Sequence, residues 1–350
     1  MVPLTISAQN GIINQYDYFD KQIASLNLSN YYILRNGDFA YNKSYSNGYP
    51  YGTVKKLDKF EEGALSSLYI CFKVINVDSN YLTFYFDSNK WNREVKLISG
   101  EGARNHGLLN LSPVDFFNIK LFISSNNKEQ IKIAYFLKLL NRKIKLLSLK
   151  IQALKKYKEG LIQQALKSTI KVPLNKLINE SSNKTVTNNQ YVLLSSTSKG
   201  IFLQSDFFNH QVASKNNIGY KILEEGQIVF SPQNLWLGNI NLLTKYKIGC
   251  VSPSYKIFDI NTKIVDSNYL IEIMRTKLFL HKYKLCSEQG ASVVRRNLDL
   301  DQFLNIRVPI PSNDKFYSLL KEINYLIEKE SSKLNIIISI KNYLLKNMFI

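Results

Sequence analysis

The sequence predicts an α+β protein with two duplicated mixed α/β globular domains, separated by two long helices that pair as an antiparallel coiled coil with pseudo-twofold symmetry. Three observations predict this fold. The 350 residues repeat themselves at an offset that drifts only between 189 and 186. Each copy is followed by a long segment that lacks proline and carries apolar residues at heptad spacing. Within each copy, short aromatic and β-branched runs alternate with turn residues.

The repeat starts at Gly11-Ile12, which matches Gly200-Ile201, and it continues to the end of each copy. Further matching pairs are Gln15 and Gln204, Asp17 and Asp206, Tyr31 and Tyr220, Gly37 and Gly226, Tyr69 and Tyr255, Gly102 and Gly290, and Phe116 and Phe303. A period this long indicates a duplicated domain, because solenoid repeats run at about 20–50 residues. Two related domains in one chain indicate two related ligand sites.

The repeat divides the chain into four parts. Residues 1–125 form the first globular domain, 126–167 a central long helix, 168–312 the second globular domain, and 313–350 a C-terminal long helix. A short apolar stretch, Val172–Ile178, is expected to open the second domain. Nothing equivalent precedes Leu4, so we expect the first domain to lack this opening segment and to be incomplete at its N-terminal side.

Strands are expected where aromatic and β-branched residues gather between turn signals such as Asn36-Gly37, Asn47-Gly48 and Ser99-Gly100. The expected strands are Tyr31–Leu34, Leu65–Phe72, Tyr81–Phe86, Gly226–Phe230 and Pro253–Phe258.

The first long helix is expected from Asn127 to about Gln164, capped by Asn126 or Asn127, with Glu129 in its first turn. About 38 residues at ~1.5 Å each give a rod of roughly 55 Å. The second helix is expected from about Asp314 to Phe349, with Glu330 and Lys341 interrupting its apolar stripe. The expected seam residues are Leu137, Leu140, Ile144, Leu147, Ile151, Leu154, Ile323, Ile327, Leu334 and Ile337. The simplest arrangement pairs the two helices with each other; the alternative packs each on its own domain.

The charge balance points to a polyanionic partner. Lys and Arg number 46 against 27 Asp and Glu, a net charge of +19. An AT-rich coding sequence, which favours Asn, Lys, Ile and Tyr, would account for part of this excess. The three cysteines, Cys71, Cys250 and Cys286, are odd in number and far apart, which is typical of reduced thiols. With no signal peptide and no apolar run of the ~20 residues that a membrane span needs, a soluble cytoplasmic protein is expected.

No catalytic or metal-binding constellation is present in the sequence. The histidines His106, His210 and His281 have no Cys or His partner at zinc-site spacing. There is no phosphate-binding glycine loop, and Ser231-Pro232-Gln233-Asn234 is not the signature of an amino-methyltransferase. Neither a catalytic residue nor a metal is therefore expected on this chain, and the profile favours a binding protein.

Two pairs of matched segments carry the candidate DNA-binding residues. The loop after Gly37 interleaves amides, hydroxyls, a cation and aromatics, which are residue types that read base edges and contact phosphates; burial of these aromatics in the core is the alternative. Arginines near the end of each copy could address guanine or phosphate. The candidates in these segments are Lys43, Tyr45, Asn47, Arg104 and Asn105 in the first domain, and Gln233, Asn234, Trp236, Arg295 and Arg296 in the second; Lys199 is a further candidate outside them.

In its ordered motifs the chain resembles the specificity subunit of Type I restriction-modification systems, over essentially its full length. The segments that carry the resemblance are Leu4–Gly11, Gly37–Lys43, Arg104, Gly107–Leu111, Asp115–Phe117, Glu129–Ala134, Leu154–Gln164, Gly226–Ser231 and Ser287–Ala291. Each motif alone is moderately specific, and the ordered, duplicated set makes the resemblance strong.

The resemblance implies a non-catalytic subunit whose two target-recognition domains each read one half of a split site in double-stranded DNA. It implies partnership with two methylation subunits and with restriction subunits. S-adenosylmethionine, ATP and Mg would be bound by these partners and none by this chain. Two alternatives stay open: a specificity subunit of a related two-sided-cutting restriction system, and a coiled-coil scaffold with duplicated protein-binding domains.

Overall fold

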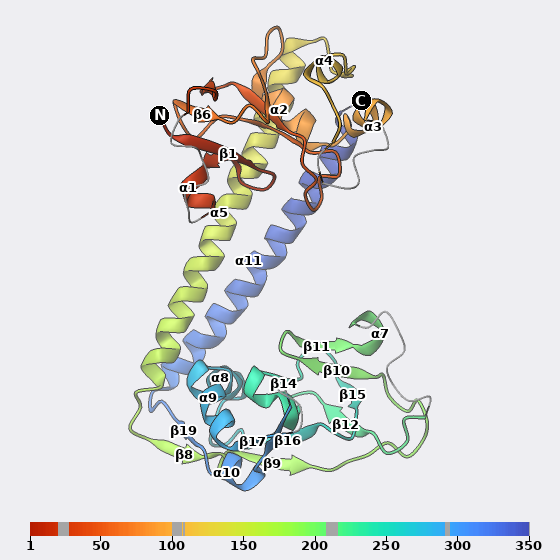
Figure 1. Cartoon of the computed structure of the whole chain (residues 1–350). Helices are drawn as coiled ribbons and strands as arrows, with labels where there is room; N and C mark the ends of the chain where they lie inside the picture. The colour runs from red at the N-terminus through yellow and green to blue at the C-terminus, as the bar shows by residue number, and fades with distance from the viewer. Residues whose placement is uncertain (20–27, 100–106, 108, 208–215, 291–294, 350) are drawn as a thin grey trace. The chain divides into compact units, whose positions relative to one another are not determined.

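The structure is a computed structural model that describes residues 1–19, 28–99, 107, 109–207, 216–290 and 295–349. It divides into two compact units, residues 1–149 with 330–350, and residues 150–329. Each unit contains one globular domain and part of both long helices (Figure 1). The predicted fold class, two mixed α/β domains and two long helices, is confirmed.

In its described residues, the first domain is built from two small sheets and four short helices. Its strands are β1 (Pro3–Ser7), β2 (Gly11–Asn14), β3 (Tyr32–Arg35), β4 (Phe39–Asn42), β5 (Thr53–Lys56), β6 (Glu62–Leu65) and β7 (Ile70–Phe72). Its helices are α1 (Gln15–Phe19), α2 (Ser79–Asp87), α3 (Asn92–Ile98) and α4 (Pro113–Phe117). One sheet has the order β2-β1-β6-β3 and the other the order β5-β4-β7. Both bury one apolar face, because residues alternate sides along a strand.

The second domain repeats these elements in the same order and, within the described residues, adds others. Its strands are β8 (Lys171–Pro173), β9 (Ile178–Ser181), β10 (Leu194–Thr197), β11 (Gly200–Leu203), β12 (Lys221–Glu224), β13 (Ile228–Phe230), β14 (Ile240–Leu242), β15 (Ile248–Val251), β16 (Lys256–Ile260), β17 (Ser287–Gln289), β18 (Arg296–Leu298) and β19 (Arg307–Pro309). Its helices are α6 (Leu174–Leu177), α7 (Gln204–Phe207), α8 (Ser267–Met274), α9 (Lys277–Leu285), α10 (Leu300–Leu304) and the 3-10 helix η2 (Pro232–Leu237). The added elements are β8, α6, β9, η2, β17, β18 and β19. The sheet equivalent to β5-β4-β7 is β14-β13-β16-β9, with one strand more.

A pair of glycines shows how closely the two backbones agree. A Cβ on Gly63 would lie 2.3 Å from Cδ1 of Leu4, and a Cβ on Gly249 would lie 2.4 Å from Cδ1 of Leu194. The same close approach of two strands therefore occurs in both domains, and only glycine leaves room for it.

Two strand predictions were wrong, one in the type of element and one in its bounds. Residues Tyr81–Phe86 belong to helix α2, whose first turn is capped by the Asp78 carboxylate, an acceptor for the backbone N–H of Tyr81 at 2.8 Å. Helix α8 starts identically, with Asp266 accepting from the backbone N–H of Tyr269 at 2.9 Å. The expected strand Leu65–Phe72 is two strands, because a turn in which the Tyr69 N–H bonds to the Ser66 carbonyl separates β6 from β7.

The long helices are α5 (Asn127–Ala165) and α11 (Asp314–Asn347). In the first unit, Leu137 at the start of α5 shares a core cluster with Leu345 at the end of α11. In the second unit, Ile162 near the end of α5 shares a cluster with Leu320 near the start of α11. The two helices therefore run antiparallel. In each unit, both helices also pack on the globular domain of that unit.

Candidate nucleic-acid interface

Helix η2 presents three of the candidates in the second domain. Ser231 precedes it, Pro232 occupies its first turn, and it ends at Gly238, whose φ of 87° is the left-handed conformation that favours glycine. Gln233 is exposed at the surface, whereas Trp236 is half-buried against the core. This turn therefore offers one free amide beside one partly covered indole.

The structure brings Trp236 and Arg296 together. The Arg296 guanidinium lies 6.0 Å from the centre of the Trp236 ring, within the range of a cation–π contact. Its Nε donates to Ser287 Oγ at 2.8 Å, and its Nη2 donates to the carbonyls of Lys284 and Ser287. Arg296 thus holds the β17–β18 pair to η2, and the neighbouring Arg295 is the exposed cation.

Asn234 is placed differently from Gln233. Its side-chain oxygen is buried, and no donor reaches it within the part of the chain that the structure describes. An enclosed amide oxygen cannot approach a base edge without movement of η2. Of the two adjacent amides, Gln233 is therefore the one whose side chain is accessible.

The first-domain loop is braced against Gly107 and Leu111. Lys43 Nζ donates to the Leu111 carbonyl at 3.2 Å, and the Tyr45 backbone N–H donates to the Gly107 carbonyl at 2.7 Å. The Tyr45 side chain remains 63% exposed, and Asn47 lies at the exposed tip of a turn. Arg104 and Asn105, the other candidates in this domain, lie outside the described residues.

The aromatic side chains divide between core and surface. Tyr41 is fully buried and stacks on Phe116, with ring centres 4.7 Å apart. Its hydroxyl donates to the Tyr51 carbonyl at 2.8 Å, and burial raises the pKa of this hydroxyl well above its ordinary value. The alternative of a core position therefore holds for Tyr41, whereas Tyr45 projects from the surface.

Lys199 lies on a separate hairpin. It occupies the turn between β10 and β11, where its backbone N–H donates to Thr197 Oγ1 at 3.1 Å and its side chain is exposed. No contact described for this residue links it to η2 or to β18, so it is an isolated exposed cation rather than part of the Trp236–Arg296 cluster.

Sequence reasoning missed a basic cavity in the first unit. A cavity of about 300 Å³ is lined by Lys55, Lys56 and Lys59 together with Lys138 of α5 and the β1–β2 turn around Asn10. Lys56 Nζ donates to Asn80 Oδ1 at 2.7 Å, and Lys59 Nζ donates to the Asn10 carbonyl at 2.7 Å. The run Lys55-Lys56 followed by Lys59 was the available signal, but only the fold adds Lys138.

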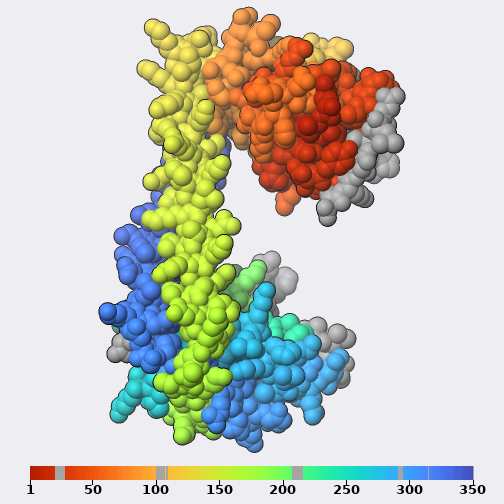
Figure 2. Space-filling model, turned by 90° about the vertical axis from the view of Figure 1, so that its left-hand side faces the viewer, coloured from red at the N-terminus to blue at the C-terminus, as the bar shows by residue number. Residues whose placement is uncertain are grey.

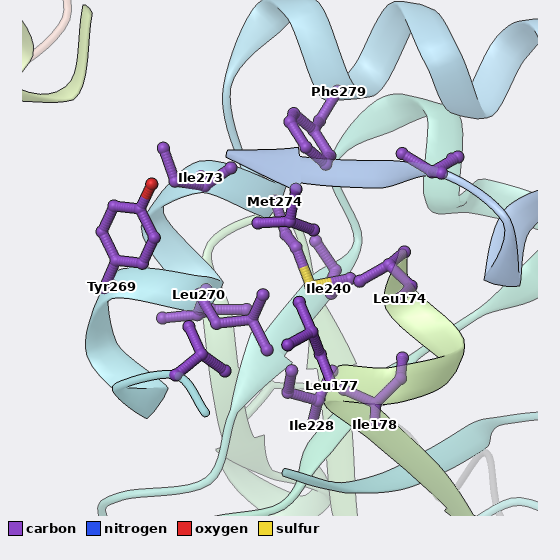
Figure 3. Packing of buried hydrophobic residues seen from close by; sticks show 14 of the residues in the cluster. Leu174, Leu177, Ile178, Ile228, Ile240, Tyr269, Leu270, Ile273, Met274 and Phe279 are labelled. Carbon is purple, nitrogen blue, oxygen red and sulfur yellow. The ribbon is translucent and has the colours of Figure 1, made fainter. Parts of the chain in front are cut away.

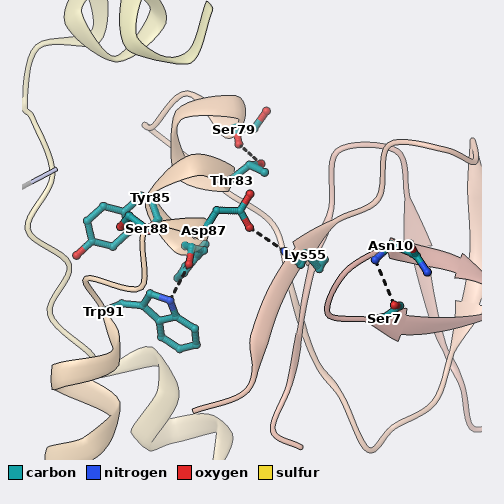
Figure 4. Close-up of polar contacts among 10 residues, drawn as sticks. Ser7, Asn10, Lys55, Ser79, Thr83, Tyr85, Asp87, Ser88 and Trp91 are labelled. Atoms are coloured by element: carbon teal, nitrogen blue, oxygen red, sulfur yellow. Dashed lines mark hydrogen bonds and ion pairs between the residues drawn. The ribbon is translucent and has the colours of Figure 1, made fainter. Parts of the chain in front are cut away.

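Two carboxylates, Asp58 and Asp87, line this cavity. Lys55 Nζ lies 2.8 Å from the Asp87 carboxylate (Figure 4). Burial lowers the pKa of Lys341, an effect that Asp87 opposes and Lys55 reinforces. Burial also lowers the pKa of Lys56. The four lysines that line the cavity outnumber its carboxylates, so this region is positively charged.

All ten expected seam residues are buried or half-buried: Leu137, Leu140, Ile144, Leu147, Ile151, Leu154, Ile323, Ile327, Leu334 and Ile337. The opposite face of α5 carries exposed apolar side chains, among them Tyr135, Leu139, Leu146 and Leu149. Figure 2 shows α5 from its uncovered side, where no other element lies over it. Exposed apolar stripes of this kind mark interaction surfaces.

The described residues contain no group of three His, Cys, Asp or Glu side chains that could hold a metal ion. Cys71, Cys250 and Cys286 are free thiols, and burial raises the pKa of each, that of Cys71 to about 12. Within the described ranges, the helices offer no apolar stretch long enough to cross a membrane.

Comparison with known proteins gives a match in structure only. No protein-family model matches the chain, and no curated protein matches its sequence. The Type I restriction-modification S subunit from M. genitalium aligns with 90% of this chain and 83% of its own, at 14% identity and a TM-score of 0.57. A chain from a structure of the assembly and conformational transition of the type I R-M system aligns with 98% of this chain and 90% of its own, at 12% identity and a TM-score of 0.51. The chain therefore has the fold of a Type I specificity subunit.

Proposed function

We propose that this protein is a non-catalytic, sequence-specific double-stranded DNA-binding subunit that reads a bipartite target and directs methylation and restriction subunits to it. The observation that carries the proposal is a duplicated scaffold with different side chains at equivalent surface positions. The loop with Lys43, Tyr45 and Asn47 occupies the place that η2, with Gln233 and Trp236, occupies in the other domain. Reading two different half-sites requires such a difference, because sequence is read by the side chains that reach base edges.

Charge supports the choice of DNA as the ligand. The net charge is +19, and exposed or partly exposed cations such as Lys199, Arg295 and Lys59 lie on both domains. Phosphate contacts of this kind supply affinity and position the protein, and base contacts then supply specificity.

The long helices support docking of partner subunits. The exposed apolar stripe of α5 through Tyr135, Leu139, Leu146 and Leu149 is suited to a protein partner rather than to DNA. We assign this stripe to the methylation subunits. These partners, together with the restriction subunits, would bring the S-adenosylmethionine, ATP and Mg²⁺ that the chemistry needs.

The decisive experiment is co-expression with a Type I methylation subunit from the same organism, followed by methylation profiling of the host DNA. The expected result is methyladenine in both halves of one split motif. Exchange of the residues 38–51 loop for that of another specificity subunit should change one half of the motif and leave the other unchanged. An unchanged motif after the exchange would remove the assignment of this loop, and no methylation at all would count against the function.

A salt titration of DNA binding by the chain alone distinguishes a DNA reader from a protein scaffold. Counterion release makes the affinity of a DNA reader fall steeply as the salt concentration rises, with a slope of about −0.9 per phosphate contact in a double-logarithmic plot. A coiled-coil scaffold would show negligible affinity for DNA at every salt concentration.

A further inference from the structure

The core of the second domain is closed by one short segment, residues 171–181. Strand β9 pairs antiparallel with β16, with Phe258 opposite Glu180 and Ile260 opposite Ile178. Strand β8 pairs with β19, with Val308 opposite Val172. Between them, Leu174 and Leu177 of α6 are 0% exposed. Figure 3 shows Leu174, Leu177 and Ile178 packed among core residues from the sheet and from α8.

The first domain contains the equivalents of the residues that surround this segment in the second domain. Val77–Leu82 is identical in sequence to Val265–Leu270, and Phe72 and Phe116 are equivalent to Phe258 and Phe303. Residues 119–123 follow α4 as β19 follows α10, which makes Leu121 the equivalent of Val308.

Residues 171–181 close the site in the second domain. Within residues 1–19, 28–99, 107 and 109–149, the first domain has no counterpart of this segment. Strand β7 pairs only with β4 there, and residues 119–123 belong to no strand. The result is an apolar cavity of about 240 Å³, lined among others by Phe72, Val74, Leu82, Phe116, Ile119 and Leu121. These are the equivalents of residues that surround Leu174 and Leu177 in the second domain.

We infer that this groove of the first domain binds an extended polypeptide segment that carries the pattern Val-Pro-Leu-x-x-Leu-Ile of residues 172–178. The segment adds a strand to the free edge of β7 and places its two leucines in the cavity, which is strand addition with apolar anchors. A second copy of this chain is a poor donor, because its own residues 171–181 are already buried in its second domain. The inference does not depend on DNA binding.

Charge refines the expected partner. In the second domain, Asn179 lies opposite Asp259, whereas the equivalent of Asp259 in the first domain is Lys73, which lines the groove. Opposite charges on facing strand positions attract each other. A segment with an acidic residue at the position of Asn179 should therefore bind the first domain more tightly than the segment with asparagine.

The test uses the full chain and a fluorescent peptide with the sequence of residues 169–181, followed by fluorescence anisotropy. We expect saturable 1:1 binding, tightened several-fold by Asn179→Asp in the peptide. Replacing both peptide leucines by Asp should weaken binding by about tenfold or more, because a carboxylate would be buried without a partner. In the protein, Leu121→Asp should have the same effect, whereas the control Leu97→Asp, at an exposed position of α3 outside the groove, should have none.

Hydrogen exchange keeps the test independent of the folding of a variant. On the wild-type chain, the peptide should slow exchange in β7 and residues 119–123, and leave β16 unchanged. Absence of saturable binding, or binding without protection of β7, would overturn the proposal. A chain that is dimeric alone and becomes monomeric on addition of the peptide would assign the groove to a second copy, and would equally overturn it.

Discussion

The two domains use different polar pairs to hold the sheet against its first helix. In the first, Lys55 of β5 pairs with Asp87 at the end of α2. At the equivalent positions of the second, Asn241 of β14 accepts a hydrogen bond from Arg275, whose Nε also donates to the Ile240 carbonyl at 2.9 Å. The cation has moved from the strand to the helix, and burial lowers the pKa of Arg275. The sheet and helix are thus fastened together in both domains, although the charges that fasten them differ.

This difference separates what the duplicated fold requires from what it tolerates. Both domains keep the aspartate cap of the first helix, the glycine beneath the N-terminal strand and an aromatic at the position of Phe116 and Phe303. Surface turns and polar pairs vary. Variation at constant backbone is what allows one scaffold to present two recognition surfaces.

The largest expected difference in stability between the two domains concerns the groove. Leu177→Ala should lower the free energy of unfolding of the second domain by about 2–5 kcal/mol, because it leaves a cavity in a closed core. Leu121→Ala in the first domain should cost about 1 kcal/mol or less, because one side of Leu121 already faces open space. Hydrogen exchange in increasing urea reports each domain separately. Equal losses would mean that the two cores are equally closed.

Substitution of the paired glycines, in contrast, should destabilise the two domains equally. Gly63→Ala and Gly249→Ala each push a methyl group into a buried leucine and towards a carbonyl 3.1 Å away. Each should destabilise its own domain by about 1–3 kcal/mol, as overpacking does. The same exchange experiment measures both, with Gly160→Ala on the open surface of α5 as the control. A loss in one domain only would show that the two frameworks are not equivalent.

Exchange of the polar pairs tests whether they are interchangeable. Lys55 and Asp87 are largely buried, with 12% and 25% of their side chains exposed, so Lys55→Ala should cost about 1–2 kcal/mol. The double variant Lys55→Asn with Asp87→Arg transplants the pair of the second domain and should recover part of that loss. Urea unfolding of the four corners of this cycle gives the coupling energy. A double variant less stable than Asp87→Arg alone would show that the pair depends on its surroundings.

The sequence was sufficient for the long helices and insufficient for α2, and the reason is physical. Heptad spacing without proline indicates a long helix, and only the surface against which that helix packs was left open. In contrast, Tyr81, Leu82, Phe84, Tyr85 and Phe86 are all buried, so the run lacks a polar face and resembles a buried strand. The Asp78 cap, repeated at Asp266, was the signal that would have identified the helix.

The candidate site was foreseen only where neighbours in sequence are neighbours in space. Trp236 and Arg296 were chosen separately, and their contact depends on how β18 packs on η2. The basic cavity was missed because Lys138 is contributed by α5, far along the chain from Lys55 and Lys59. The lining of the groove in the first domain is visible only in the folded structure, because it joins residues of β7, α2 and α4 with residues 119–123.

The smallest expected effect distinguishes two adjacent arginines. Arg295 is exposed, so Arg295→Ala should leave stability unchanged and weaken DNA binding about three- to tenfold, with the salt slope reduced by about 0.9 if one phosphate contact is lost. Arg296→Ala removes the donor for Ser287 Oγ and two carbonyls and should lower the free energy of unfolding by about 1 kcal/mol. Anisotropy at several salt concentrations and urea unfolding measure the two effects. Identical behaviour of the two variants would mean that the structure does not divide binding from stability between these residues, and would leave Gln233 as the accessible candidate on this surface.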